Sequence, residues 1–253
     1  MAGEPRRRTS GHVDLASAVS ATLTEAVGSR LAEVRRRIAG AGADPDAITI
    51  VAVTKGFGAD AVLAALDNGL VDIGENYADE LVAKAAEVAR RDPGRAGAIR
   101  WHFQGDLQSN KINRLAPHVS LWQTIGSANR AASLAQRIPG AEVLVQVNVV
   151  GAQNRSGCTP GDVVGVVEAC RALGLRTRGL MAVGPDPTAA PDARSALLAS
   201  DAAFATVREL ADALELPVRS IGMTDDFERA IAASATMIRL GSFFFGRRDK
   251  KLV

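Results

Sequence analysis

Lysine is scarce in this sequence of 253 residues. Only five of its 30 basic residues are lysines, and the other 25 are arginines. The lysines are Lys55, Lys84, Lys111, Lys250 and Lys251. Arginine stays protonated and is no nucleophile, so it cannot replace a lysine whose amine takes part in chemistry. Lys55 ends an apolar run and is therefore the first candidate for such a role.

The sequence also lacks an excess of charge, a long apolar segment and a cysteine framework. Its net charge is +2 at pH 7, which gives no reason to expect a nucleic acid or a membrane surface as partner. No apolar run approaches the roughly 18 residues of a membrane-spanning helix, and the N-terminus has no signal-peptide core. Cys158 and Cys170 show neither a disulfide framework nor the spacing of metal ligands. We therefore expect a cytoplasmic protein without a metal site.

The composition is that of one globular domain. Apolar residues make up 47% of the chain and charged residues 23%, and α/β barrels of about 250 residues form single domains. Residues 1–12 are polar and rich in arginine, which predicts a disordered tail. Residues 249–253 form a short second tail, so residues 13–248 remain for the domain.

The spacing of apolar residues predicts a long N-terminal helix and then an alternation of strands and helices. The helix runs from about Val13 to Ala39 and ends at Gly40 and Gly42. The predicted strands are Ile48–Val53, Val71–Ile73, Arg100–Gln104, Val119–Thr124, Glu142–Val149, Thr177–Val183, Pro217–Ile221 and Met237–Leu240. Later helices include Ala59–Leu66, one that begins at Thr159-Pro160, Asp192–Glu215 and Asp225–Ala235.

Eight strands, each but the last followed by a helix, predict a parallel sheet closed into a (β/α)8 barrel of the TIM type. The barrel would form a single domain with an extra helix at its N-terminus. An open doubly wound sheet is the alternative, but no Gly-x-Gly-x-x-Gly turn follows the first strand.

Lys55 directly follows the first predicted strand, so its amine would lie at the C-terminal face of the barrel, where active sites of this fold are found. Burial of the lysine stem disfavours the charged form of the amine, and an uncharged amine can form a Schiff base. The other interpretation is a lysine whose head reaches solvent from a strand end. Position alone does not decide between the two.

The turns after the seventh and eighth strands are rich in hydrogen-bond donors. They contain Ser220, Gly222, Met223 and Thr224 in one turn and Gly241 and Ser242 in the other. Barrels often hold phosphate groups at these two strands, although Thr224 could simply cap the next helix. Arg239 on the eighth strand favours a phosphate ligand, on the side of the barrel opposite Lys55. An amine and a phosphate site suit pyridoxal 5′-phosphate (PLP), or the phosphosugar substrate of a Schiff-base aldolase.

Other polar residues in the strands have less specific interpretations. His102 lies within an aromatic strand and is expected to be a hydrogen-bonded histidine of the core. Gln146 and Asn148 alternate along the fifth strand and would point to one face. Tyr77, the only tyrosine, follows the second strand and is expected to be structural.

Six ordered segments resemble the pyridoxal phosphate homeostasis proteins, a family of small single-domain PLP-binding proteins. They are Ala52–Lys55, Gly74–Tyr77, His102–Gly105 with Leu107–Lys111, Gly179–Ala182, Ser220–Asp226 and Arg239–Ser242. The resemblance extends from about Leu15 to Arg248, and it implies a barrel like the N-terminal domain of alanine racemase with PLP bound covalently.

The resemblance also implies roles for individual residues. Lys55 matches the lysine that forms the Schiff base, Arg239 matches the arginine that faces the pyridine nitrogen, and Asn76 matches a residue near the ring. The positions that match the phosphate site are Thr224, Gly241 and Ser242, with Ser220, Gly222 and Met223 alongside.

Three positions depart from the family pattern. Phe57 stands where many relatives carry a second lysine, which puts transfer of PLP between two such lysines in doubt. Asp106 replaces a proline or histidine, and no aromatic residue follows Asp249.

Together, the residues and the resemblance predict a PLP carrier with no catalytic residues and no strong turnover. Arg239 would donate a hydrogen bond to an unprotonated ring nitrogen, which weakens the ring as an electron sink. Racemases of this kind draw a tyrosine from a second domain, for which the chain is too short. The expected state is a monomer, with apo forms of PLP-dependent enzymes as recipients. A PLP-dependent amino-acid racemase or a Schiff-base aldolase is the alternative.

Overall fold

The computed structural model of the chain describes residues 15–151 and 155–246. The tails predicted at residues 1–12 and 249–253 lie outside these ranges. Within them, no helix combines the length and the apolar character needed to cross a bilayer.

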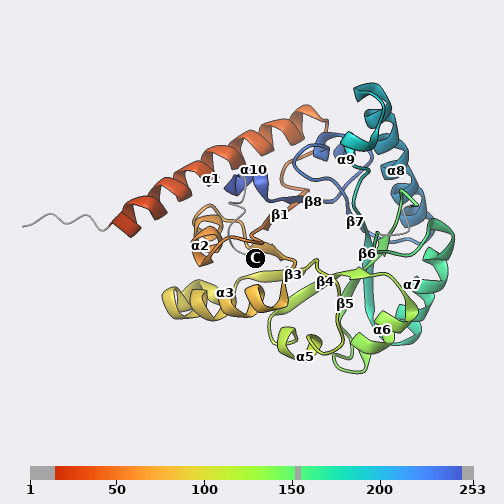
Figure 1. Ribbon diagram of the computed structural model, residues 1–253, viewed down its shortest axis with the longest axis horizontal. Coiled ribbons are helices and arrows are strands. Elements are labelled where there is room, and N and C mark those ends of the chain that lie inside the picture. Colours follow the sequence, from red (N-terminus) through yellow and green to blue (C-terminus); the bar gives the residue numbers. More distant parts are fainter. Residues whose placement is uncertain (1–14, 152–154, 247–253) are drawn as a thin grey trace, which may run out of the picture.

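Eight parallel strands form a closed barrel (Figure 1). They are β1 (Thr49–Val53), β2 (Asp72–Glu75), β3 (Arg100–Phe103), β4 (Val119–Ile125), β5 (Glu142–Val147), β6 (Arg176–Ala182), β7 (Val218–Ser220) and β8 (Met237–Leu240). They are paired in chain order, and β8 pairs with β1 from Thr49 beside Met237 to Ala52 beside Leu240. All eight predicted strands and the (β/α)8 barrel are thereby confirmed, and the open doubly wound sheet is excluded.

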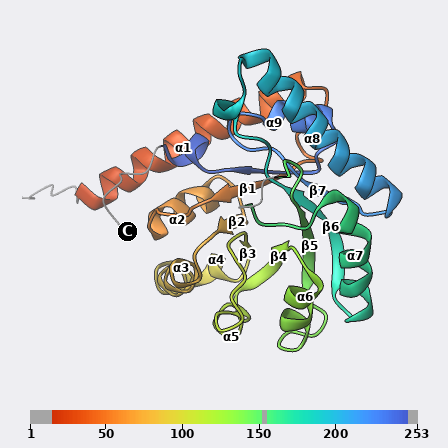
Figure 2. The same ribbon diagram turned by 45° about the vertical axis from the view of Figure 1, so that its right-hand side comes forward.

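Helices surround the barrel (Figures 1 and 2). They are α1 (Leu15–Gly40), α2 (Ala59–Asp67), α3 (Ala78–Arg91), α4 (Pro93–Ala96), α5 (Ile112–Leu115), α6 (Ala128–Ala135), α7 (Val163–Ala172), α8 (Ala193–Ala213), α9 (Phe227–Ala232) and α10 (Ser242–Phe245). The extra helix α1 lies against α2 and α10. The expectation that no helix follows the last strand was wrong, because α10 is a single turn and too short to show a periodic pattern.

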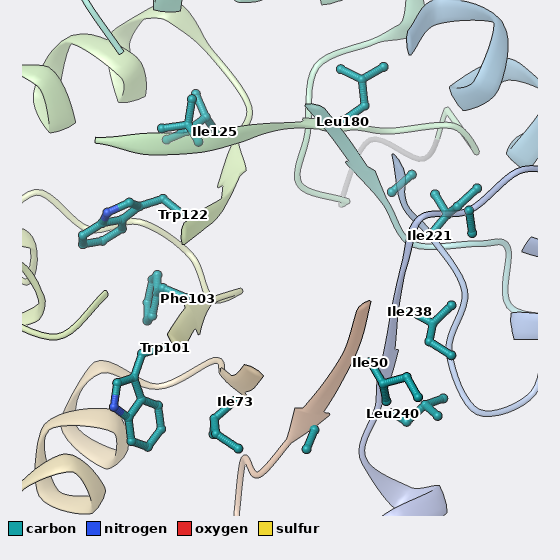
Figure 3. Packing of buried hydrophobic residues seen from close by; sticks show 14 of the residues in the cluster. Ile50, Ile73, Trp101, Phe103, Trp122, Ile125, Leu180, Ile221, Ile238 and Leu240 are labelled. Atoms are coloured by element: carbon teal, nitrogen blue, oxygen red, sulfur yellow. The ribbon is translucent and has the colours of Figure 1, made fainter. Parts of the chain in front are cut away.

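Two apolar clusters follow from the alternation of side chains along the strands. Ile50 and Ala52 of β1 belong to the large cluster between the strands and the helices, together with the residues labelled in Figure 3. Val51 and Val53 belong to a second, smaller cluster with Leu121, Leu144, Met181 and Met237. Since neighbouring residues of a strand point to opposite faces, this smaller cluster fills the inside of the barrel.

Candidate functional site

The predicted site residues lie at the C-terminal ends of β7, β8, β1 and β2, four strands that follow one another around the barrel. Lys55 comes after β1, Asn76 comes after β2, and Arg239 lies on β8. The expectation that the phosphate turns lie opposite Lys55 was wrong. The barrel closes by pairing β8 with β1, Arg239 beside Val51, so the last strand is a neighbour of the first.

The half-buried Lys55 lies in a turn whose two flanking peptide groups are held by one ion pair. Lys84 Nζ donates to the carbonyl oxygen of Thr54 at 2.7 Å. The N–H of Gly56 donates to Glu80 Oε2 at 2.8 Å, and Glu80 Oε2 lies 2.9 Å from Lys84 Nζ. Gly56 has φ +76°, which favours glycine. The ion pair on α3 therefore fixes the backbone on both sides of Lys55.

A buried carboxylate completes this support. Glu75, at the end of β2, accepts hydrogen bonds from Lys84 Nζ at 2.5 Å and from the Thr54 hydroxyl at 2.6 Å. Its side chain is fully buried, and that of Lys84 is nearly so. Burial raises the pKa of Glu75, and the charge of Lys84 acts against this shift. Each charge of this pair depends on the other, because neither has water to stabilise it.

Arg239 is buried on β8 and held by β6 and β7. Its guanidinium donates to the Ser220 carbonyl at 2.6 Å, to the Ser220 hydroxyl at 2.8 Å and to the Ala182 carbonyl at 2.8 Å. The backbone N–H of Arg239 donates to the carbonyl of Gly222 at 3.0 Å. Burial lowers the pKa of Arg239 to about 10, and the charge of Asp226 opposes the shift. Arg239 is therefore a fixed, protonated donor at neutral pH.

Two hydroxyl groups meet where the last two turns come together. Thr224 Oγ1 lies 3.1 Å from Ser242 Oγ, although the two residues belong to different turns. Met223, in the first of these turns, is exposed, and its N–H donates to Asp226 Oδ1 at 2.6 Å. Burial raises the pKa of Asp226. The structure thus joins Thr224 to Ser242, and it joins both Ser220 and Gly222 to Arg239. The N–H of Met223 is used within its own turn.

The turn with Gly241 lies beside the turn with Lys55. A Cβ atom at Gly241 would lie 3.1 Å from the carbonyl oxygen of Val53, two residues before Lys55. The rings of Phe57 and Phe245 are 5.5 Å apart between centroids, which links the Lys55 turn to α10. Phe57 therefore packs against α10. The turn with Lys55 and the turn with Gly241 and Ser242 therefore meet at one corner of the barrel mouth.

Three buried polar atoms at the ends of β2 and β3 have no hydrogen-bond partner in the part of the chain that the structure describes. One is Oε2 of Glu75, whose other oxygen is held by Lys84 and Thr54. The other two, Asn76 Oδ1 and Gln104 Nε2, belong to the residues that directly follow the two strands. A buried polar atom without a partner costs about 1–3 kcal/mol. A polar ligand at the barrel mouth can supply the missing partners, so these atoms fit a ligand site better than a closed core.

The backbone at Asn76 leaves no room for a side chain at Gly105. A Cβ atom at Gly105 would lie 1.8 Å from the carbonyl oxygen of Asn76. We expect Gly105→Ala to lower the free energy of unfolding by about 1–3 kcal/mol, since the backbone must move to accept the methyl group. Urea unfolding measures the loss, and Gly97→Ala is the control, because a Cβ atom there meets nothing within 4 Å. Equal stability of the two variants would contradict the prediction.

The remaining sequence candidates lie away from this corner or inside the core. His102 is buried and hydrogen-bonded to Asp72 and Gln123, which confirms it as a core histidine. Tyr77 is 52% exposed. Burial raises the pKa of both thiols, Cys158 and Cys170, to about 11, so neither is a nucleophile at neutral pH. Among the described residues, no group of His, Cys, Asp or Glu could hold a metal ion.

The sequence did not predict the residues that hold the turn with Lys55 in place. Lys84 and Glu80 are spaced as a pair on one helix face, a pattern more typical of an exposed ion pair. Glu75 was noted only as part of a motif. Gln123 interrupts the apolar β4 with a polar side chain, which is the signal that could have singled it out.

Comparisons with known proteins agree with this arrangement. The profile of the alanine racemase N-terminal domain family matches residues 20–249. A pyridoxal phosphate homeostasis protein of Pseudomonas aeruginosa is 39% identical over 235 residues, which cover 90% of this chain and 96% of that protein. One of Escherichia coli is 35% identical over 232 residues, 88% of this chain and 97% of that protein. The structure of PipY from Synechococcus elongatus with PLP bound is similar at a TM-score of 0.72 and 27% identity, covering 87% of this chain and 100% of that one.

Proposed function

Because the chain belongs to the pyridoxal phosphate homeostasis protein family, we propose that it binds PLP as a Schiff base on Lys55 and serves PLP homeostasis without strong catalytic turnover. The observation that carries the proposal is the corner between β1 and β8. There, the turn with an amine and the turn with paired hydroxyls lie against each other beside a buried arginine.

The residues at this corner suit the chemical groups of PLP. The amine of Lys55 would bind the aldehyde carbon, and Thr224 and Ser242 with the Gly241 turn would bind the phosphate. Arg239 would donate to the ring nitrogen, and Asn76, whose Oδ1 has no partner among the described residues, would lie near the ring. Ser220, Gly222 and Met223 shape the surrounding turn. When bound, PLP supplies an aldehyde that condenses with amines and a ring that can accept electrons.

The charge state of Arg239 favours binding over turnover. With a pKa of about 10, its guanidinium stays protonated at neutral pH and can only donate hydrogen bonds. A donor leaves the ring nitrogen unprotonated, so the ring withdraws electrons weakly. Hydrogen bonds to Ser220 and to the carbonyl of Ala182 hold the guanidinium in place, so a donor would face the ring nitrogen. The donor role of Arg239 supports the proposal of a carrier, and we assign no catalytic residue.

The cellular setting belongs to the same proposal. We take residues 13–248 as one PLP-binding domain of a cytoplasmic monomer that passes PLP to apo forms of PLP-dependent enzymes. The small net charge of +2 supports a protein partner or free PLP over a nucleic acid.

Borohydride trapping tests the proposal. We expect PLP to give the purified protein a visible absorbance band, and reduction should fix one PLP per chain on the peptide that contains Lys55. Peptide mass spectrometry measures the position, and the Lys111 peptide of the same digest is the internal control. Label on Lys111 or no label would overturn the proposal. Trapping of a phosphosugar instead would indicate an aldolase, and rapid exchange of an amino acid's α-proton with deuterated solvent would indicate a racemase.

A further inference from the structure

A chain of buried hydrogen bonds crosses the inside of the barrel from Arg239 to Asp72. Arg239 Nη1 donates to Ser220 Oγ at 2.8 Å, and Ser220 Oγ donates to Gln123 Oε1 at 2.8 Å. Gln123 Nε2 lies 2.7 Å from His102 Nδ1, and His102 Nε2 lies 2.9 Å from Asp72 Oδ1. The five side chains come from β8, β7, β4, β3 and β2. All five residues are buried.

We call these five hydrogen-bonded side chains, from Arg239 to Asp72, the relay. Its two ends determine the direction of the hydrogen bonds between them. Arg239 can only donate, so Ser220 Oγ accepts a hydrogen bond from it. The hydroxyl of Ser220 in turn donates a hydrogen bond to Gln123 Oε1. The amide of Gln123 then presents its NH2 group to His102 Nδ1, which accepts, and the ring proton lies on Nε2. Asp72 Oδ1 accepts the hydrogen bond from this N–H group. Burial opposes ionisation of Asp72, but the hydrogen bonds from His102 and Arg100 outweigh burial and lower its pKa.

The contact of Gln123 with Met237 agrees with this direction. Gln123 Nε2 lies 3.4 Å from Met237 Sδ, a weak acceptor that suits an NH2 group. A turned amide would leave the Ser220 hydroxyl without its acceptor and would place the amide oxygen against Met237 Sδ, which is also an acceptor. The hydrogen bonds of the relay therefore favour this direction.

We propose that Gln123 and His102 are positioning residues. Through Ser220, they hold the guanidinium of Arg239 in the orientation in which it donates a hydrogen bond to the PLP ring nitrogen. The effect on PLP rests on the proposed function, whereas the direction of the relay does not. Gln123 contacts Ser220 and His102 contacts Gln123, so both act on Arg239 from inside the barrel. Sequence alone suggested no link between β4 and the PLP site.

Two variants of Gln123 separate positioning from simple packing. Gln123→Met keeps the length of the side chain but leaves the Ser220 hydroxyl without its acceptor, so we expect about tenfold weaker PLP binding in an absorbance titration. Gln123→Glu retains an acceptor for Ser220, and we expect binding within about threefold of the unchanged protein. Ser200→Ala is the control, because it removes a buried hydroxyl bond to the Ala196 carbonyl on α8, outside the relay. Its PLP affinity should be unchanged.

Nitrogen NMR of the imidazole supplies a second readout that needs no PLP. In the protein without PLP at neutral pH, His102 should be the neutral tautomer with its proton on Nε2, and in Gln123→Glu the ring should carry both protons. Full PLP affinity of Gln123→Met, equal losses in both variants, or a proton on Nδ1 of the unchanged protein would each overturn the inference. If the unchanged protein binds no PLP, the proposed function fails while the NMR result still tests the relay. If Gln123→Met does not fold, the NMR result and Gln123→Glu decide.

Discussion

Replacing Lys55 by alanine should abolish covalent capture of PLP and leave the fold intact. The side chain is half-buried in a turn after β1, and the contacts that fix this turn are made by the backbone of its neighbours, Thr54 and Gly56. The loss of the amine therefore removes the bond-forming group without removing its support. The visible absorbance band should disappear, and borohydride should fix no PLP on the chain.

Lys55→Arg is the matched variant, because it keeps the positive charge. A guanidinium is no nucleophile, so this variant should also form no reducible adduct. Weak reversible binding should persist in both variants through Arg239 and the paired hydroxyls of Thr224 and Ser242. Equilibrium dialysis measures it, and Lys111→Ala, which loses only an ion pair with Asp79, should behave like the unchanged protein. An unchanged absorbance band in Lys55→Ala would place the covalent bond elsewhere.

The place of Lys55 at the C-terminal end of β1 could be predicted from the sequence because it depends on local order. A lysine that ends an apolar strand is visible without knowledge of any partner, and the turns after the last two strands show their hydroxyl and glycine residues equally directly. The alternation of strands and helices likewise predicts the barrel, since only one closed arrangement of eight parallel strands pairs them in chain order.

The predicted barrel already brings β8 beside β1, so the expected opposition of the lysine and the phosphate turns does not follow from it. What the sequence could not show is contact between side chains of distant segments. Gln123 and Ser220 touch across the barrel although they are far apart in the chain. Their hydrogen-bonding direction depends on buried partners at both ends, and no local pattern encodes it.

Lys84→Met should be the most destabilising of the substitutions considered. It leaves the carboxylate of Glu75 fully buried with the Thr54 hydroxyl and without a compensating charge. Breaking a buried ion pair in this way costs about 3–5 kcal/mol. The substitution also frees the carbonyl of Thr54, so the turn with Lys55 loses one of its two supports and PLP capture should slow. Urea unfolding and the rate of absorbance change on mixing with PLP measure the two effects.

The cause of this loss can be isolated by pH and by a second substitution. Burial already raises the pKa of Glu75 in the folded protein, and loss of Lys84 removes the charge that opposes the shift. A carboxyl group with a raised pKa in the folded state favours folding at low pH and disfavours it as the pH rises through that pKa. The deficit of Lys84→Met should therefore be largest near pH 7.5 and smaller at pH 5.5. Adding Glu75→Gln to Lys84→Met should recover part of the stability at pH 7.5, because no buried charge then remains unpaired. A loss of stability that depends neither on pH nor on Glu75 would mean that Lys84 acts through packing alone.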